Sequence, residues 1–291
     1  MSVLVTGASG LLGRSVCRRL NDAGHEVISV LRPGSDADST RCQSVVANLA
    51  DPNWVGQSLP RQIAVVMHLA QSRRFRDFPD GASDVFGVNV NATAQLLDYA
   101  VRSGATHFIY ASSGGIYRRG EVPLAENAPL EPPGELGFYL GSKAAAEILV
   151  QAYSSLLNVV IVRPFFVYGP GQRRDMLIPR IFNSVGAARP IRLDGEDGLS
   201  INPIHVEDAA IAVSRAASLT EGAVINIAGP ETLTLREIAF SFGEHLGRPP
   251  IFERTGEPSR SMLGSIDLMS DLLHAPQRRL RDFVSDIAVG P

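Results

Sequence analysis

The sequence predicts an α/β protein with a doubly wound parallel sheet and a smaller, discontinuous C-terminal lobe. Two patterns support this fold class. In the first half of the chain, short runs rich in Val and Ile alternate with segments of helical periodicity. Such continuous apolar runs are typical of parallel strands buried on both faces, and right-handed crossovers then place helices on both sides of the sheet. After Pro164, short apolar pieces are instead separated by clusters of Gly, Pro and charged residues.

The expected elements follow in chain order. The expected strands are Val3–Thr6, Glu26–Leu31, Ser44–Ala47, Ala64–Ala70, Thr106–Ser112, Val159–Pro164 and Ala223–Ala228. The expected helices are Leu11–Ala23, Asp84–Ser103, Phe138–Leu157, Val206–Ala217 and Leu235–Leu246, with a glycine directly after three of them as a C-terminal signal. We therefore expect a sheet domain over 1–165 and a lobe over 166–291, from which roughly 203–228 returns to the sheet.

Composition narrows the class of protein. The 291 residues are 45% hydrophobic and 20% charged, which is typical of a soluble globular chain. The net charge of −3 gives no basic footprint for nucleic acid or an anionic membrane. We expect no membrane span, because no apolar run approaches the roughly 18 residues needed to cross a bilayer. We expect no signal peptide, because the N-terminus lacks a basic region before its apolar run. Cys17 and Cys42 lack metal-ligand spacing, so we expect no metal site and a cytoplasmic location.

A glycine-rich turn over Thr6–Gly13 connects the first expected strand to the first helix. Gly7 permits a tight turn, Gly10 lets the backbone approach a pyrophosphate, and Gly13 lets helix and strand pack closely. The helix N-terminus adds free N–H groups and the positive end of its dipole. The turn therefore predicts a Rossmann-type dinucleotide site. Its expected cofactor-binding residues are Gly7, Ser9, Gly10, Leu11, Leu12, Gly13 and Arg14.

The end of the second expected strand bears on the choice of cofactor. An acidic residue at this position would bind the 2′-hydroxyl of NAD, but the strand ends with Leu31 and Arg32. Leu31 cannot hydrogen-bond the ribose, whereas the Arg32 guanidinium could bind a 2′-phosphate, and Arg14 could reach the same group. The alternative is that both arginines are solvated surface residues. The pattern favours NADP over NAD.

A candidate catalytic group begins the helix expected over Phe138–Leu157. Tyr139 and Lys143 are four residues apart and so share one helix face, where an ammonium would lower the pKa of the phenol. Ser113 follows the expected strand Thr106–Ser112, at the edge of the sheet where the cofactor would lie. The alternative for Tyr139 and Lys143 is an ordinary surface pair. Glu147 is expected to form a helix ion pair with Lys143.

These features belong to a longer series of motifs. The series reads TGASGLLG at 6–13, HLA at 68–70, NVNAT at 89–93, YASSGGIY at 110–117, YLGSK at 139–143, RPFFVYGPG at 163–171, IHVEDAA at 204–210 and INIAGPETLTLREIA at 225–239. Over nearly its whole length the chain resembles the extended short-chain dehydrogenases/reductases, in particular the NAD-dependent epimerase/dehydratase group that includes nucleotide-sugar epimerases. The resemblance implies a catalytic triad of Ser113, Tyr139 and Lys143.

The resemblance also implies further cofactor contacts. Ala70 would lie by the pyrophosphate and Asn89 near the cofactor, while Asn48 and Leu49 occupy the place of the usual Asp-Leu or Asp-Ile pair beside adenine. The complete set of expected contacts beyond the glycine-rich turn is Arg32, Asn48, Leu49, Leu69, Ala70, Gln71, Asn89, Tyr139, Lys143 and Pro164. The chain after Pro164 would cover the nicotinamide and bind the substrate.

Three departures from the family pattern concern the substrate. Gly114-Gly115 stand where dehydratases carry an Asp-Glu pair, so water elimination is not expected. Phe166 and Ile201 replace an Asn and a diphosphate-binding Arg of the galactose-type epimerases. Either another arginine binds the diphosphate, or the substrate carries no nucleotide diphosphate. The candidate arginines are Arg173, Arg174, Arg180 and Arg192, with a solvated loop as the alternative for the first two.

We therefore expect an NAD(P)-dependent epimerase or ketoreductase of a sugar-like, nucleotide-linked substrate, with Tyr139 as general acid and base. The alternatives are an NADP-dependent reductase of a non-nucleotide carbonyl compound and a non-catalytic dinucleotide-binding sensor or scaffold. A homodimer is expected through Asp84–Ser103 and Phe138–Leu157, because both helices are apolar over more than one face. The apolar residues in question are Val85, Val88, Leu96, Leu97, Ala145, Ile148, Leu149 and Ala152.

Overall fold

The computed structural model describes residues 1–35, 42–56, 59–120 and 123–288. The chain divides into two compact units. The sheet unit comprises residues 1–116, 130–163 and 210–225, and the C-terminal unit comprises 117–129, 164–209 and 226–291. Both units are therefore built from discontinuous segments of the chain.

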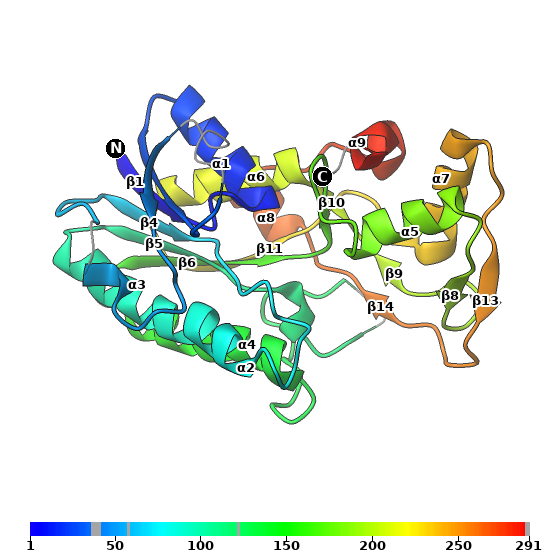
Figure 1. The fold of residues 1–291 in the computed structure, drawn as a ribbon, viewed down its shortest axis with the longest axis horizontal. Helices are drawn as coiled ribbons and strands as arrows, with labels where there is room; N and C mark the ends of the chain where they lie inside the picture. The colour runs from blue at the N-terminus through cyan, green and yellow to red at the C-terminus, as the bar shows by residue number, and fades with distance from the viewer. Residues whose placement is uncertain (36–41, 57–58, 121–122, 289–291) are drawn as a thin grey trace. The chain divides into compact units, whose positions relative to one another are not determined.

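Within the described residues, the central sheet has seven strands in the order β11-β6-β5-β4-β1-β2-β3 (Figure 1). The strands are β1 Ser2–Thr6, β2 Glu26–Leu31, β3 Gln43–Val46, β4 Val65–His68, β5 His107–Ala111, β6 Asn158–Pro164 and β11 Ala223–Ile227. β1 pairs in parallel with β2 on one side and with β4 on the other, so the winding reverses beside β1. The predicted doubly wound α/β fold is confirmed, and ligands of such sheets bind at this reversal.

Helices cover both faces of the sheet. α1 (Leu11–Asp22) lies on one face, and α3 (Ala92–Arg102) and α4 (Gly137–Ala152) lie on the other (Figure 1). Successive strand residues point to opposite faces, so Leu4 of β1 packs with Leu96 and Val150 of the two neighbouring helices. The remaining elements of this unit include the 3₁₀ turns Trp54–Gly56, Gly114–Ile116 and Ala216–Ser218, and α6 (Val206–Arg215) begins before it.

The helix predicted over Asp84–Ser103 is interrupted. The structure has α2 (Ala82–Phe86), a π-helical turn at Gly87–Asn91 and then α3. A π turn carries one extra residue, and functional sites often have one. Here the turn aims the Asn89 side chain inward, and the Thr93 hydroxyl donates a 2.7 Å hydrogen bond to the Asn89 carbonyl. The apolar pattern alone continues through this turn and gives no sign of it.

The apolar surfaces of these helices differ in part from the prediction. Val85, Val88, Leu96 and Leu97, which we expected to supply a partner surface, are all buried within the subunit. Ile148 is 69% exposed and lies between the exposed Ala145 and Ala152 on α4, as expected, and Phe86 is exposed on α2. An uncovered apolar surface therefore exists mainly on α4.

The C-terminal unit has its own core. Its strands are β7 Val167–Tyr168, β8 Ile191–Leu193, β9 Ser200–Ile201, β10 Ile204–His205, β12 Leu233–Thr234, β13 Phe252–Arg254 and β14 Ser261–Met262. Its helices are α5 Leu177–Gly186, α7 Leu235–Leu246, α8 Asp267–Leu272, the 3₁₀ turn Leu280–Phe283 and α9 Val284–Ala288. The buried Asp208 carboxylate accepts hydrogen bonds from His274 and from the backbone of Gln277 and Arg278, which fixes the segment leading to α9. Across the described residues, none of the helices has the length and apolarity to cross a membrane.

Candidate active site

The glycine-rich turn is sterically closed to larger residues. A Cβ on Gly13 would lie 2.1 Å from the Gly7 carbonyl oxygen, and a Cβ on Gly7 would lie 2.7 Å from the Ala70 nitrogen. Gly7 also has φ +70°, a conformation that favours glycine. Among the described residues, no side chain caps the first turn of α1 and no acidic residue lies within it. The turn therefore has the close backbone approach and the uncapped helix N-terminus that a pyrophosphate site requires.

The segment after β4 lies against this turn. The Ala70 nitrogen donates to Thr6 Oγ1 at 3.4 Å, and the Leu69 nitrogen donates to the Thr6 carbonyl oxygen at 3.3 Å. The Ser72 nitrogen donates to Asn89 Oδ1 at 3.0 Å. These contacts bring Leu69 and Ala70 beside Gly7 in the sheet unit; that Ala70 lies by a pyrophosphate stays a prediction.

The tip of β2 also returns to the glycine-rich turn. The Ser35 nitrogen donates to the Arg32 carbonyl oxygen at 3.0 Å, and the Ser35 hydroxyl lies 3.4 Å from the Ser9 hydroxyl. Arg32 is exposed beside this turn, and Arg14 is half-buried in the first turn of α1. Leu31, in contrast, is fully buried, so it faces the core and not a ribose. This burial agrees with the expectation that Leu31 offers no hydrogen bond to a ribose.

Asn48 and Leu49 are engaged locally. Asn48 Oδ1 accepts a 3.2 Å hydrogen bond from the Ala50 nitrogen, which forms a turn at the end of β3. Leu49 packs against the core on the α3 side of the sheet. Pro164 ends β6. Asn48 and Leu49 thus follow β3, and Pro164 is the last residue of β6.

A chain of buried hydrogen bonds connects the first strands to the helices. His68 Nδ1 lies 2.6 Å from Thr6 Oγ1, and His68 Nε2 lies 3.0 Å from Thr93 Oγ1. Burial lowers the pKa of His68 to about 3, helped by the charge of Lys143, so the ring is neutral at physiological pH. His68 is thus a buried connector between β1, β4 and α3.

The same series of hydrogen bonds continues to α4, the helix that carries Tyr139 and Lys143. Asn89 Nδ2 donates to the Ser142 hydroxyl at 2.9 Å, and that hydroxyl donates to the Tyr139 carbonyl oxygen at 2.6 Å. Asn89 therefore holds α4 in place as well as residue 72. Sequence reasoning missed Thr6, Thr93 and Ser142 as parts of this site. Only their membership of short motifs could have drawn attention to them.

Of the predicted triad residues, Ser113 follows β5 and the other two, Tyr139 and Lys143, lie on α4; each has a partner of its own. Tyr139 donates from its hydroxyl to Gln71 Oε1 at 2.6 Å. Lys143 Nζ donates to the Ala111 carbonyl oxygen at 2.8 Å and lies 5.1 Å from the centre of the Tyr110 ring. Ser113 Oγ accepts a 3.1 Å hydrogen bond from the Gly115 nitrogen.

The expected lowering of the Tyr139 pKa is wrong for the arrangement in this structure. Burial raises the pKa of Tyr139 to about 12, and burial lowers the pKa of Lys143 to about 7 against the opposing charge of Glu147. The spacing correctly places both residues on one helix, but the Lys143 ammonium is bonded to Ala111. Because burial disfavours the charged form of Lys143, fewer molecules carry the ammonium that would stabilise a phenolate at Tyr139.

Glu147 forms a different ion pair from the one expected. Its two carboxylate oxygens accept from Arg163 Nε and Nη2 at 3.0 and 2.7 Å, and both side chains are buried. Arg163 lies near the end of β6, sixteen residues away, where helix spacing gives no information. The expected Glu147–Lys143 pair is therefore replaced by a bidentate pair that joins α4 to the sheet.

The candidate phosphate-binding arginines lie in the C-terminal unit. Arg173 makes a bidentate pair with Asp175, at 3.0 and 2.7 Å, and Arg174 donates to the Ile287 carbonyl oxygen at 2.8 Å. Arg180 on α5 and Arg192 on β8 are exposed. In the same unit Ile201 is fully buried, and Phe166 packs with apolar residues at φ +42°. Arg180 and Arg192 are therefore the better candidates of the four.

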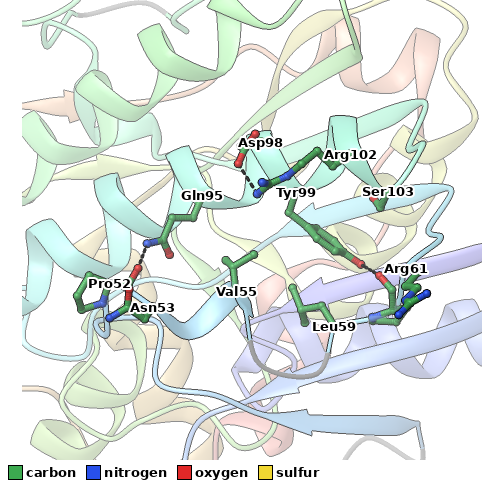
Figure 2. Close-up of a pocket in the computed structure, with 11 residues that line it drawn as sticks. Pro52, Asn53, Val55, Leu59, Arg61, Gln95, Asp98, Tyr99, Arg102 and Ser103 are labelled. Carbon is green, nitrogen blue, oxygen red and sulfur yellow. Dashed lines mark hydrogen bonds and ion pairs between the residues drawn. The ribbon is translucent and has the colours of Figure 1, made fainter.

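A separate pocket of about 820 Å³ lies at the other edge of the sheet unit (Figure 2). Residues 52, 53, 55 and 59–61, which precede β4, form one wall, and α3 forms the other. The Tyr99 hydroxyl donates to the Pro60 carbonyl oxygen at 2.8 Å, and Asp98 pairs with Arg102 (Figure 2). The pocket contains none of the predicted site residues, because those follow the carboxyl ends of strands.

Comparison with known proteins identifies the family. A family model described as the NAD dependent epimerase/dehydratase family matches residues 3–228. The chain belongs to this family. It is thus an enzyme of the extended short-chain dehydrogenase/reductase type, and the resemblance seen in the sequence is confirmed. Across the described residues, there is no group of three or more His, Cys, Asp or Glu side chains that could hold a metal ion.

Three proteins to which this chain is similar show what its relatives bind or do. A UDP-glucose 4-epimerase from Mycolicibacterium smegmatis is 28% identical over 306 residues, covering 98% of this chain and 96% of that protein. The structure of a UDP-glucose 4-epimerase from Thermus thermophilus in complex with NAD matches with TM-score 0.84 and 25% identity, over 99% of this chain and 98% of that one. The structure of MoeE5 in complex with UDP-glucuronic acid and NAD matches with TM-score 0.81 and 26% identity, over 100% and 97%.

Proposed function

We propose that the protein is an NAD(P)-dependent epimerase of a nucleotide-linked sugar, with Tyr139 as the residue that moves the proton. One observation carries this proposal. The glycine-rich turn, Gln71 and Ser113 follow β1, β4 and β5, which are neighbours in the sheet, and Tyr139 contacts Gln71. A dinucleotide on the turn and a proton carrier would then share one edge of the sheet.

The residues fit a dinucleotide. Gly7 and Gly13 leave the space that side chains would fill, and the uncapped turn of α1 offers amide donors to a pyrophosphate. When bound, a nicotinamide supplies hydride chemistry to a carbinol or carbonyl carbon. Tyr139 would exchange a proton with the substrate oxygen, Ser113 would orient that oxygen, and Lys143 would bind the nicotinamide ribose. These roles follow from the positions of the three side chains around the edge of the sheet.

The proposal of a nucleotide-linked substrate rests on the relatives, since the proteins above are named or solved with UDP-sugars. In this chain Arg180 and Arg192 remain candidates for the diphosphate, because Arg173 and Arg174 have other partners. Mass spectrometry of small molecules released from the purified protein tests the substrate class. A UDP- or dTDP-sugar would support it. A panel of nucleotide sugars that neither bind nor turn over would contradict it.

The second candidate is a ketoreductase of the same substrate class that uses NADP. The tip of β2 favours this function, because Arg32 is exposed beside the Ser9–Ser35 contact and no acid occupies the end of the strand. The solved relatives named above contain NAD, which favours the epimerase. The fate of the cofactor distinguishes the two functions. An epimerase retains its NAD and leaves it unchanged overall, whereas a reductase oxidises one equivalent of added NADPH per turnover.

A further inference from the structure

Gln71 occupies a fixed place between the dinucleotide turn and the catalytic helix. The residue before it, Ala70, is bonded to Thr6 at the end of β1. The residue after it, Ser72, is buried, and its nitrogen donates to Asn89 at 3.0 Å. The backbone of Gln71 is therefore held on both sides, although its side chain is exposed. The position of the Gln71 side-chain amide therefore depends on the group to which it is hydrogen-bonded.

That partner is Tyr139. The phenol donates to Gln71 Oε1 at 2.6 Å, and the Tyr139 ring packs on Phe75, from the same loop as Gln71, at 5.0 Å between ring centres. An amide oxygen has lone pairs but no proton, so it accepts from a phenol and repels a phenolate. With the amide in this orientation the contact is made by the protonated form of Tyr139, whereas a phenolate would require the amide to rotate and present its Nε2–H groups. The amide group of glutamine is neutral, so this selection does not require a charged neighbour.

The other titratable and charged groups near Tyr139 have partners other than its hydroxyl. Lys143 is on the same helix, with its ammonium bonded to Ala111, and Glu147 is paired with Arg163. From β5, Tyr110 has its pKa raised by burial and, to a smaller extent, by the charge of Tyr139. From the loop after β4, the Arg76 guanidinium lies 4.9 Å from the centre of the Phe75 ring, which covers Tyr139. Of these described groups, Gln71 is the one whose hydrogen bond reaches the Tyr139 hydroxyl.

We propose that Gln71 is a positioning residue that holds Tyr139 as a hydrogen-bond donor before substrate binds. A substrate carbonyl oxygen is the chemical equivalent of Gln71 Oε1, so it can take over the same hydrogen bond. The site is thereby set to protonate a carbonyl, the step that a ketoreductase needs. The assignment of Tyr139 as proton carrier rests on the proposed function, but the contact with Gln71 does not.

The test measures the titration of Tyr139 directly and needs no substrate. Tyrosine is replaced biosynthetically by 3-fluorotyrosine, which lowers phenol pKa values, and ¹⁹F NMR follows each ring against pH while the protein is folded. The resonance missing from Tyr139→Phe identifies Tyr139. Gln71→Ala should lower the midpoint of this resonance by about 0.4–1 pH unit, the equivalent of one neutral hydrogen bond. Gln71→Glu should raise it, because a carboxylate opposes formation of phenolate.

Two comparisons make the result specific. Gln151→Ala, at an exposed glutamine of α4, should leave the Tyr139 midpoint unchanged. Gln71→Asn, whose side chain is one methylene shorter, should behave like Gln71→Ala. An unchanged or raised midpoint in Gln71→Ala, or a lowered one in Gln71→Glu, would overturn the assignment. Failure of the proposed function would be seen elsewhere, as normal turnover by Tyr139→Phe, and would leave this titration unaffected.

Discussion

A single substitution at the exposed Arg32, at the tip of β2, tests whether this residue determines the relative affinity for NADP and NAD. Arg32→Ala removes the guanidinium but leaves the strand and the Ser9–Ser35 contact in place, because the Ser35 turn is bonded to the backbone of Arg32. We expect weaker binding of NADP and little change for NAD, since the two differ only in the 2′-phosphate. Arg32→Asp should go further, because a carboxylate repels the phosphate and offers an acceptor to the 2′-hydroxyl of NAD.

The expected magnitude follows from exposure. A hydrogen bond to a charged group contributes about 1.5–3 kcal/mol. Arg32 is solvent-exposed, where salt screens the interaction, so the lower end of that range applies. About 1.5 kcal/mol corresponds to roughly a tenfold increase in the dissociation constant for NADP. The effect should shrink when the ionic strength of the buffer is raised about tenfold, because added salt shortens the range of the charge interaction.

Isothermal titration calorimetry with NAD and with NADP measures the two dissociation constants for each variant. Arg61→Ala is the matched control, because Arg61 is an exposed arginine at the opposite edge of the sheet unit. It should change neither affinity. Equal affinities of the unmodified protein for NAD and NADP would refute the reasoning. Equal losses for both cofactors in Arg32→Ala would show that Arg32 acts on the common part of the molecule.

Three further predictions concern chemistry, assembly and stability. Tyr139→Phe should keep the circular dichroism spectrum and lower kcat by about 10²–10⁴, the usual worth of general acid–base catalysis; near-normal kcat would remove Tyr139 from the mechanism. The protein should be a homodimer by light scattering and Ile148→Asp a monomer, because Ile148 is 69% exposed on the uncovered face of α4; a monomeric unmodified protein would contradict this. Glu147→Gln should lower the free energy of unfolding by about 3–5 kcal/mol, since it removes the carboxylate charge that balances the buried Arg163 guanidinium, and the double variant with Arg163→Met should recover much of that loss in urea unfolding; a loss below about 1 kcal/mol would show that the pair is dispensable.

The strands and the edge that carries the site could be predicted from sequence for a physical reason. Parallel strands buried on both faces need continuous apolar runs, so each one stands out between helices, and their carboxyl ends must share one edge. The glycine-rich turn is equally local, because the steric demand on Gly7 and Gly13 comes from residues of the turn and the adjoining strand. Local signals of this kind determine the fold and the position of the dinucleotide site.

The partners of the polar side chains could not be predicted in the same way. Helix spacing suggested Lys143 for Glu147, but the carboxylate pairs with Arg163 of β6, which the fold brings beside α4. The Gln71–Tyr139 contact spans 68 residues and depends on where two separate segments end. At the end of β2 the sequence does not show which side chain faces the core; in the structure Leu31 is fully buried and Arg32 is exposed. Which side of a strand end faces the ligand is decided by tertiary packing.

The proton chemistry of Tyr139 depends on these long-range partners more than on its helix. A lysine four residues away lowers the pKa of a phenol only when its ammonium faces the phenol oxygen. In this structure the Lys143 ammonium is bonded to the Ala111 carbonyl, and the nearest carboxylate on its helix, Glu147, is committed to Arg163. Tyr139 is therefore left with a neutral acceptor, Gln71, and remains a donor. An epimerase requires Tyr139 to act as a base in its first step, so binding of the cofactor or substrate would have to redirect the Lys143 ammonium or displace the Gln71 side chain. Reduction of a carbonyl could instead begin from the arrangement in this structure, in which Tyr139 is a donor.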